Sequence, residues 1–255
     1  FLYLSVNPHT MCTLEKRGTL FILTLTGADR DQHRLNPNLI ASIRSKLAEV
    51  KSQAVNGSAL VTVAEGRFFS NGFDLNYAQS VGVKAGSTEA AKAALTNMVD
   101  LFKGVVSDYL SLPMPTIAAV TGHAAAAGLM LAMSHDYVVM TSSKAVMYMS
   151  ELDIGMSLPD YFTALIREKV AKASAARDLV LRAAKVTAED AVGMGIVDSV
   201  QGSAEEVAEV AVRKAEELAK RKWSGKAYAE IRKSLYPEVC ELLGLKVEGV
   251  MPSKL

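Results

Sequence analysis

PMPTIAAVTGHAAAAGLMLAMSHDYVVMTSSKAVMYMSELDIG, residues 113–155, is the stretch that decides the fold. Pro113 and Pro115 disfavour a helix, so the apolar run that follows them is expected to be a buried strand. Small residues then separate this strand from a second apolar run with helical character. The elements predicted here are a strand at 116–120, a small-residue segment at 122–128, a helix at 129–134, and strands at 137–140 and 145–149.

The same alternation of strands and helices continues on both sides of this stretch. Upstream, apolar runs predict strands at 20–25 and 58–63, a helix that Pro37 opens, and a second helix over 87–112. Beyond Pro159 the pattern is helical, with 196–200 as the only clear strand and charged periodic segments at 203–222 and 226–243. We therefore predict an α/β fold whose sheet is largely parallel, layered and packed by helices. We also predict that residues 11–200 form the core and that residues 201–252 form a helical C-terminal region.

Composition excludes several classes of protein. Lys and Arg total 28 against 27 for Asp and Glu, which leaves no net field to attract nucleic acid or a membrane surface. The chain is 50% hydrophobic and 22% charged, so it can bury a sizeable core. Cys12 and Cys240 stand far apart without a Cys/His cluster, which predicts free thiols and no metal. No apolar stretch reaches 18 residues, so no transmembrane helix is expected.

The two ends carry separate signals. Residues 1–10, FLYLSVNPHT, precede Met11 and lack the design of a targeting segment, so we interpret them as a non-native leader. Ser253-Lys254-Leu255 is a tripeptide that the peroxisomal import receptor reads as an address. It predicts location in the peroxisomal matrix.

Three segments have the composition of a reaction site, although each has a plainer reading. The turn 67–75, RFFSNGFDL, exposes backbone N–H groups, yet most such turns only connect a strand to a helix. Small residues at 122–128 place free N–H groups at a helix N-terminus, or simply allow tight packing. Glu151 follows an apolar strand among methionines; burial would raise its pKa and make it a better base, while the alternative is a surface carboxylate.

Taken together, FFSNGFDL (68–75), PMPTIAAVTGHAAAAGLMLAMSHD (113–136) and MYMSELDIG (147–155) resemble the signature of the crotonase (enoyl-CoA hydratase/isomerase) superfamily over about residues 13–200. The resemblance implies a layered ββα spiral core. It also implies an oxyanion hole made by the backbone N–H groups of Phe73 and Ala127, with Glu151 as the catalytic base. Met130 stands where the family's hydratases carry a second glutamate. This pattern is similar to the delta-3,delta-2-enoyl-CoA isomerases, and with the SKL ending it is most similar to the plant peroxisomal type.

The resemblance further implies an acyl-CoA thioester as substrate, with no metal and no other cofactor. In the family the CoA arm follows the turn and the loop after the first strands, here residues 29–36. Homotrimers or dimers of trimers are usual, and the amphipathic C-terminal helices could supply the interface. The positions that the resemblance assigns to substrate binding are Arg34, Leu35, Asn71, Gly72, Leu75, Gly128 and Met130.

Other readings remain open at this point. Ser134-His135-Asp136 has the residue types of a hydrolase triad, but three adjacent side chains cannot form the relayed geometry. A thioesterase is therefore disfavoured. A dienoyl-CoA isomerase would need a further acid such as Asp153 or Asp160. A non-catalytic acyl-CoA-binding protein would keep the oxyanion hole without a working Glu151.

Overall fold

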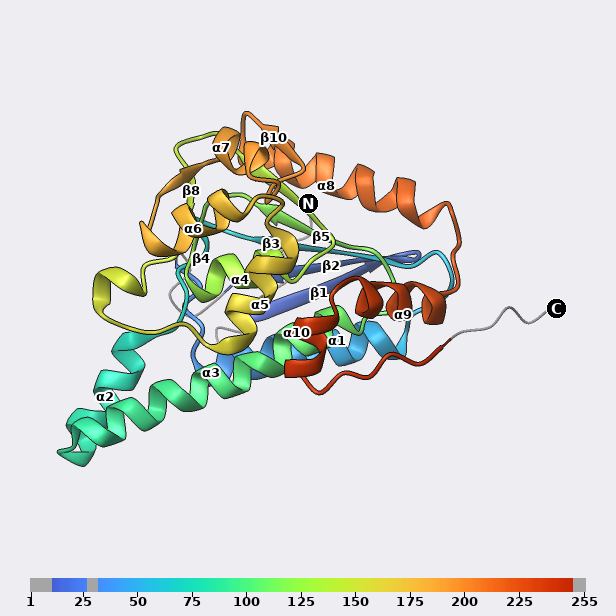
Figure 1. Cartoon of the computed structure of the whole chain (residues 1–255). Coiled ribbons are helices and arrows are strands. Elements are labelled where there is room, and N and C mark those ends of the chain that lie inside the picture. The colour runs from blue at the N-terminus through green and yellow to red at the C-terminus, as the bar shows by residue number, and fades with distance from the viewer. Residues whose placement is uncertain (1–10, 27–31, 250–255) are drawn as a thin grey trace.

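The main sheet of the computed structural model, which describes residues 11–26 and 32–249, has six strands (Figure 1). β1 is antiparallel to β2, and every other neighbouring pair is parallel. Residues 1–10, predicted to be a non-native leader, part of the loop 29–36 and the C-terminal tripeptide lie outside the described residues. The strands, in spatial order, are β1 (Cys12–Arg17), β2 (Leu20–Leu25), β3 (Ala59–Ala64), β5 (Thr116–Val120), β7 (Tyr137–Thr141) and β10 (Ser199–Gln201).

A second, smaller sheet contains β4 (Phe68–Ser70), β6 (His123–Ala125), β8 (Val146–Tyr148) and β9 (Val186–Thr187), in that order. Each of β3, β5 and β7 in the main sheet is followed directly by a strand of the small sheet, namely β4, β6 and β8. A helical segment then returns the chain to the next strand of the main sheet or closes the series. This repeated strand, strand, helix order is the predicted layered ββα spiral, so the predicted fold is confirmed.

Helices bury both faces of the main sheet. α1 (Pro37–Ser52), α3 (Thr88–Leu110), α4 (Ala127–Met133) and α5 (Asp160–Lys169) build the larger core with one face. α8 (Ala204–Ala219) covers the other face through Val207, Ala211 and Ala215. Along β2, Phe21 and Leu23 belong to the first core, whereas Leu20 and Ile22 belong to the second. Because alternate residues point to opposite covered faces, these strands are continuously apolar.

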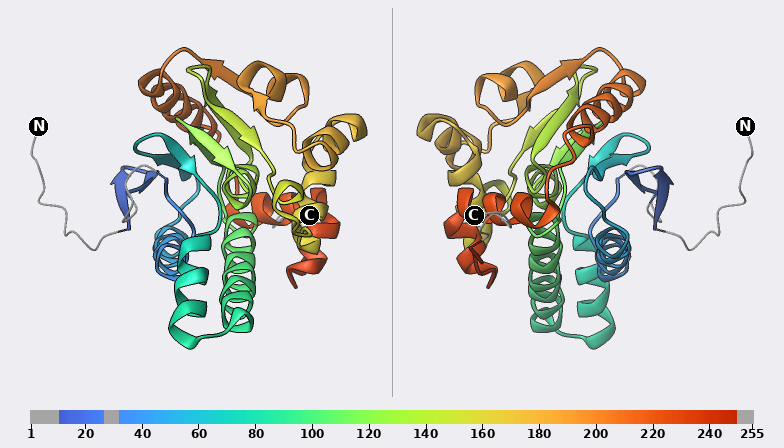
Figure 2. Two further views of the ribbon diagram at one scale, coloured as in Figure 1. Left: turned by 90° about the vertical axis from the view of Figure 1, so that its left-hand side faces the viewer. Right: turned by 90° about the vertical axis from the view of Figure 1, so that its right-hand side faces the viewer.

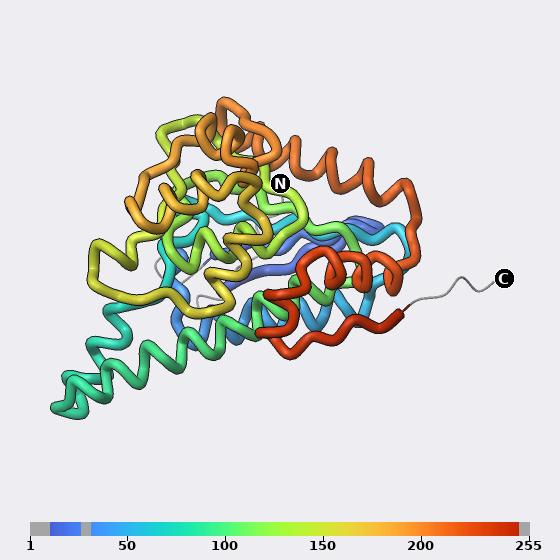
Figure 3. The backbone as a smooth tube through the Cα atoms, viewed as in Figure 1, coloured from blue at the N-terminus to red at the C-terminus, as the bar shows by residue number. Residues whose placement is uncertain are grey.

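The remaining helices lie around this core (Figures 2 and 3). α2 (Leu75–Ala85) and the start of α3 form a hairpin that projects from the body of the molecule. Its helices approach closely because Gly82 has no side chain; a Cβ there would lie 2.7 Å from Ala91 Cβ. The other short helices are η1 (Leu152–Ile154), α6 (Ala173–Leu181), α7 (Ala188–Gly193), α9 (Gly225–Leu235) and α10 (Pro237–Leu242). None of the helices among the described residues is long and apolar enough to cross a membrane.

Several predicted elements differ in detail from those observed. The predicted strand 196–200 occurs as β10, Ser199–Gln201, and it is not the only strand after Pro159, because β9 was missed. The predicted helix 129–134 begins two residues earlier, at Ala127. The segment predicted as helical over 226–243 is divided between α9 and α10 at Pro237, which cannot donate the hydrogen bond that a continuous helix needs.

A buried chain of hydrogen bonds ties α3, β3 and the end of α4 together. The Tyr109 hydroxyl lies 2.9 Å from Thr62 Oγ1, which lies 2.8 Å from His135 Nε2. His135 Nδ1 lies 2.9 Å from the Leu131 carbonyl oxygen, an acceptor, so Nδ1 carries the proton and Nε2 accepts. Burial lowers the pKa of His135 to about 3. The imidazole is therefore neutral in the folded protein at every ordinary pH.

This histidine should make the fold sensitive to mild acid. An unfolded histidine has a pKa of about 6.5. The stabilisation that accompanies the depressed pKa is fully present above that value. It is lost as the pH falls below it, because only the unfolded chain takes up the proton. Between pH 7 and pH 5 the free energy of unfolding of the wild type should fall by about 1 to 2 kcal/mol more than that of His135→Gln. Urea unfolding of both proteins at the two pH values measures this difference; equal pH dependence would contradict it.

Candidate active site

The turn after β4 is held by backbone hydrogen bonds to the segment 32–36. The Asn71 N–H donates to the Gln32 carbonyl at 2.8 Å, and the Leu35 N–H donates to the Gly72 carbonyl at 2.8 Å. The Asp74 N–H donates in turn to the Leu35 carbonyl at 3.2 Å, which forms an isolated parallel bridge between Leu35 and Phe73. In such a bridge the N–H of the middle residue points away from its partner. The Phe73 N–H is therefore directed out of the turn.

The start of α4 lies directly against this turn. A Cβ on Gly72 would lie 3.0 Å from the Ala125 carbonyl oxygen and 3.4 Å from the Ala127 nitrogen. A Cβ on Gly128 would lie 2.1 Å from the Ser70 carbonyl oxygen, closer than real atoms approach. Glycine at 72 and 128 therefore lets the two backbone segments touch, and a side chain at either position would push them apart.

Two backbone N–H groups are left over where these segments meet. Among residues 11–26 and 32–249, neither the Phe73 N–H nor the Ala127 N–H has a hydrogen-bond acceptor. Ala126, just before α4, has φ 51° and ψ −124°, a conformation that a residue with a side chain rarely adopts. Its own N–H donates to the Tyr148 carbonyl at 2.8 Å, which helps to hold this strained residue in place. The arrangement presents two donors to one small region, as an oxyanion requires.

Glu151 approaches the same region from the third strand of the small sheet. It follows β8 and directly precedes η1 as its N-cap, and the tight turn there returns the Ile154 and Met156 N–H groups to the Glu151 carbonyl. The residue is 8% exposed, and no described residue donates a hydrogen bond to its Oε2. Burial raises the pKa of this carboxyl, against a smaller lowering by the nearby backbone of Glu151 and Ser150. A buried carboxylate with a free oxygen is suited to take a proton from carbon.

Phe73, Glu151 and Ala126, the residue before Ala127, line one small cavity of about 60 Å³, and Ala127 itself is buried and is not among the lining residues. Among the described residues that line it, Glu151 is the only ionisable side chain. A much larger groove, about 430 Å³, lies elsewhere, beside α9, and contains neither Glu151 nor the turn. The small cavity is lined by Asn71, Phe73, Leu75, Leu95, Ala126, Ser150, Glu151, Ile154 and Met156.

Comparison with known proteins agrees with this geometry. A family model described as enoyl-CoA hydratase/isomerase matches residues 22–240. The chain belongs to the enoyl-CoA hydratase/isomerase family. This is the crotonase family that the sequence motifs predicted.

Several members of this family are close in sequence. Enoyl-CoA delta isomerase 2, peroxisomal, of Arabidopsis thaliana is 56% identical over 96% of this chain and 100% of its own length. Enoyl-CoA delta isomerase 1, peroxisomal, of the same plant is 48% identical over 90% of this chain and 91% of its own. The apo structure of an enoyl-CoA isomerase of Mycobacterium tuberculosis has a TM-score of 0.79 at 21% identity, covering 92% of this chain and 95% of that one. That structure agrees with the fold.

The other residues predicted for substrate binding in this family member fall into two groups. Asn71 and Leu75 line the cavity, whereas Leu35, Gly72 and Gly128 shape the backbone around it. Arg34 and Met130 are not among the residues that line it. The Met130 side chain is fully buried in the core.

The alternative acids and nucleophile lie away from this cavity. Ser134 Oγ donates to the Met130 carbonyl, and Asp136 is paired with Arg232, so Ser134, His135 and Asp136 form no triad. Asp153 and Asp160 are exposed and do not line the cavity. In the part of the chain that the structure describes, no three His, Cys, Asp or Glu side chains are grouped so as to hold a metal.

Five lining residues were missed by the sequence reasoning, namely Leu95, Ala126, Ser150, Ile154 and Met156. Ala126 lies within a run of four alanines between glycines, a composition that indicates close backbone packing but not a strained residue. Leu95, Ile154 and Met156 contribute apolar wall. Their signal is weak, because an apolar side chain on a helix or a turn is more often part of the core.

Proposed function

We propose that this protein isomerises 3-enoyl-CoA to trans-2-enoyl-CoA in fatty-acid β-oxidation. The observation that carries the proposal is Glu151, a buried carboxylate. Within residues 11–26 and 32–249, one of its oxygens has no hydrogen-bond partner, it is the only ionisable side chain lining the cavity, and two nearby backbone N–H groups have no acceptor. The names of the Arabidopsis relatives, which are enoyl-CoA delta isomerases, support the same activity.

The reaction needs one base acting twice. Glu151 takes a proton from C2, and the electron pair of that C–H bond delocalises over the thioester oxygen, C2 and C4 as a dienolate. The Phe73 and Ala127 N–H groups donate to the thioester oxygen, and each contributes on the order of 3 kcal/mol to stabilising its charge. Protonated Glu151 then gives the proton to C4. The double bond now lies between C2 and C3, and the carboxylate is regenerated.

Hydration is a poorer match to this site. Adding water across a double bond requires water to be held and activated, for which the family's hydratases use a second glutamate. Met130 occupies that position here, and we propose that it favours isomerisation because it supplies no second carboxylate to hold and activate water. For the CoA arm we propose the segment 32–36 with Arg34 and Leu35, which is hydrogen-bonded to the turn that holds the thioester.

A spectroscopic assay tests the activity. Purified enzyme added to 3-hexenoyl-CoA should raise near-ultraviolet absorbance, because the product is conjugated. The same enzyme added to trans-2-hexenoyl-CoA should leave the absorbance unchanged. Loss of absorbance in the second experiment would mean hydration, and no change in the first would leave the chain as an acyl-CoA-binding protein or the catalyst of another reaction.

The pH dependence of this activity should reflect the buried base. Only ionised Glu151 accepts the C2 proton, so kcat/KM should decrease as the pH falls through its pKa in the free enzyme. Burial raises that pKa, so the acidic limb should lie above 4.5, the ordinary value for a glutamate. Initial rates with 3-hexenoyl-CoA between pH 4.5 and 8 measure the limb, with circular dichroism to check folding at each pH. A rate that stays level down to pH 5 would exclude a raised pKa.

We propose the peroxisomal matrix as the location, with Ser253, Lys254 and Leu255 bound by the import receptor. The printed names of two Arabidopsis relatives include the word peroxisomal, which supports this. A fluorescent protein fused to the N-terminus should enter peroxisomes in plant cells, and removal of the last three residues should leave it in the cytosol. Equal import of both proteins would contradict this proposal.

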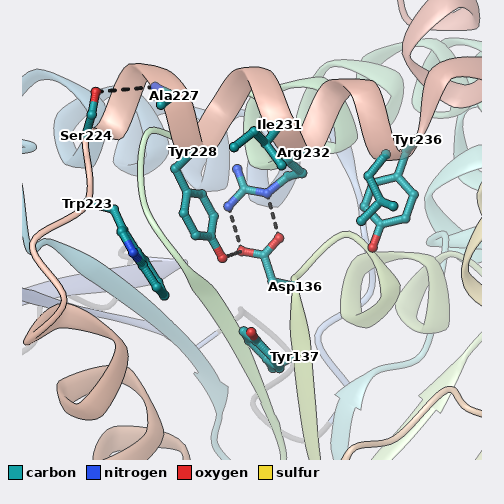
Figure 4. A pocket seen from close by; sticks show the side chains of 10 residues that line it. Asp136, Tyr137, Trp223, Ser224, Ala227, Tyr228, Ile231, Arg232 and Tyr236 are labelled. Atoms are coloured by element: carbon teal, nitrogen blue, oxygen red, sulfur yellow. Dashed lines mark hydrogen bonds and ion pairs between the residues drawn. The ribbon is translucent and has the colours of Figure 1, made fainter. Parts of the chain in front are cut away.

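We also propose a homotrimer, alone or paired, with α9 in its interface. The groove beside α9 is about 430 Å³ and mostly apolar, and Figure 4 shows Tyr228 and the Arg232–Asp136 pair between the helix and Tyr137. Ile231 and Leu235 line this groove and are 69% and 64% exposed, so they extend its apolar lining onto the surface, as an interaction site requires. Changing both to Asp should produce a smaller species in analytical ultracentrifugation, while the exposed Leu181 changed to Asp should not. An unchanged assembly, or a monomeric wild type, would exclude this interface.

A further inference from the structure

Phe73 carries a large ring, although an oxyanion donor needs only its backbone. The ring lies edge-on to Phe102 of α3, with centroids 5.7 Å apart, and is stacked 6.3 Å from Phe162 of α5. Phe102 and Phe162 are fully buried and contact each other edge to face at 6.1 Å. Such arrangements fix ring orientation as well as bury area. Phe73 is itself only partly buried and lines the cavity with Glu151, so its ring is a fixed wall between the cavity and the core.

Two other residues that line the cavity are apolar and exposed to solvent. Leu75 of α2 and Ile154 of η1 line it and are 38% and 52% exposed. Neighbouring Leu152 is also exposed. At about 60 Å³ the cavity is far smaller than the roughly 300–1,000 Å³ pockets that enclose whole ligands. It can enclose the reacting carbons of a thioester but not a long acyl chain.

We propose that Phe73 is a specificity-determining residue: its ring blocks the path into the core and directs the acyl chain outward over Leu75 and Ile154. This inference rests on the proposed acyl-CoA substrate. Straight chains longer than the cavity are then accepted, because their tails lie on the apolar rim. Affinity rises with chain length, since each methylene on the rim leaves water. The substrates are medium- and long-chain 3-enoyl-CoAs.

Binding of unreactive acyl-CoAs tests the inference whether or not the isomerase proposal holds. We would measure the Kd of hexanoyl-CoA and dodecanoyl-CoA by calorimetry. The wild type should bind the longer ligand at least about tenfold more tightly, a small part of what full burial of the extra methylenes would give. Ile154→Ser should reduce this preference by about three- to fivefold and leave hexanoyl-CoA binding within about twofold. Leu181→Ser, the same kind of change at an exposed position outside the cavity, should have no effect.

Phe73→Ala tests the wall itself. It keeps the backbone donor but opens an inward path, so in this background Ile154→Ser should no longer change the Kd of dodecanoyl-CoA. Phe73→Leu serves the same comparison if the alanine variant does not fold. Weaker binding of dodecanoyl-CoA than of hexanoyl-CoA by the wild type would overturn the proposal. The proposal would also be overturned if Ile154→Ser changed the Kd of dodecanoyl-CoA equally in the wild-type and Phe73→Ala backgrounds. Absence of absorbance change with 3-hexenoyl-CoA, in contrast, would count against the isomerase activity alone.

Discussion

Replacing Glu151 by glutamine should lower kcat/KM for a 3-enoyl-CoA by on the order of 10²- to 10⁴-fold, the range that a positioned general base contributes. Glutamine preserves the size and shape of the side chain but cannot accept the C2 proton. The Phe73 and Ala127 N–H groups are untouched, so the Kd of an acyl-CoA should change by no more than about threefold. Absorbance at the conjugated thioester band measures the rate, and calorimetry measures the Kd.

The same variant should not be less stable than the wild type. Burial raises the pKa of Glu151, so above its ordinary value the native state keeps a proton that the unfolded chain has already released. The contribution of this group to stability therefore falls as the pH rises through that window, and at pH 7.5 the buried charge is a net cost. Removing the charge should leave the urea midpoint at pH 7.5 unchanged or higher.

These measurements separate an enzyme from a binding protein. If Glu151→Gln binds acyl-CoA normally and retains its stability but does not turn over substrate, the carboxylate acts in the reaction. If turnover survives, Glu151 is not the base, and another proton acceptor must reach the substrate. A large loss of stability would instead identify Glu151 as a structural residue.

The sequence predicted the residues of the site better than the shape of the cavity. Glu151, the turn around Gly72 and the start of α4 lie in contiguous motifs, and they were predicted because those motifs together resemble the family's signature, although each alone had a plainer reading. Leu95 and Ile154 were missed, because an apolar side chain gives no sign of which way it points until the packing of α3 and η1 is known. If the Phe73 N–H faces the oxyanion, its ring must point elsewhere. Only the structure shows that the ring packs against Phe102 and Phe162.

The main strands were predicted from their apolar runs, but the small sheet was largely missed. β4 and β6 have three residues each, too few for a periodic pattern. β1 was also missed; its later residues are exposed and charged, as suits an edge strand.

The role of Asp136 could not be predicted from its neighbours in the sequence. Next to Ser134 and His135 it has the appearance of a catalytic group, but its partner, Arg232, is 96 residues away.

Arg232 should therefore be one of the most sensitive positions for stability. It is 3% exposed, and its Nε and Nη2 donate to the two Asp136 carboxylate oxygens at 2.6 Å each (Figure 4). Its Nη1 donates to the Leu112 carbonyl at 2.6 Å, and its Nη2 donates to the Met114 carbonyl at 2.5 Å. Burial alone would raise the pKa of Asp136, but the guanidinium overcomes this and the pKa is lowered. One side chain thus joins α9 to the end of α3 and to the start of β7.

Arg232→Met should lower the free energy of unfolding by about 3–5 kcal/mol, the usual cost of leaving a buried charge without its partner. Adding Asp136→Asn should recover part of the loss, since a neutral amide can still accept from the Thr116 N–H that Asp136 binds at 2.9 Å. The matched control is Arg167→Met, which breaks an exposed ion pair with Glu238 and should cost less than about 1 kcal/mol. Urea unfolding at pH 7 measures all three. If Arg232→Met costs no more than Arg167→Met, burial has not made this ion pair important, and apolar packing alone holds α9 on the core.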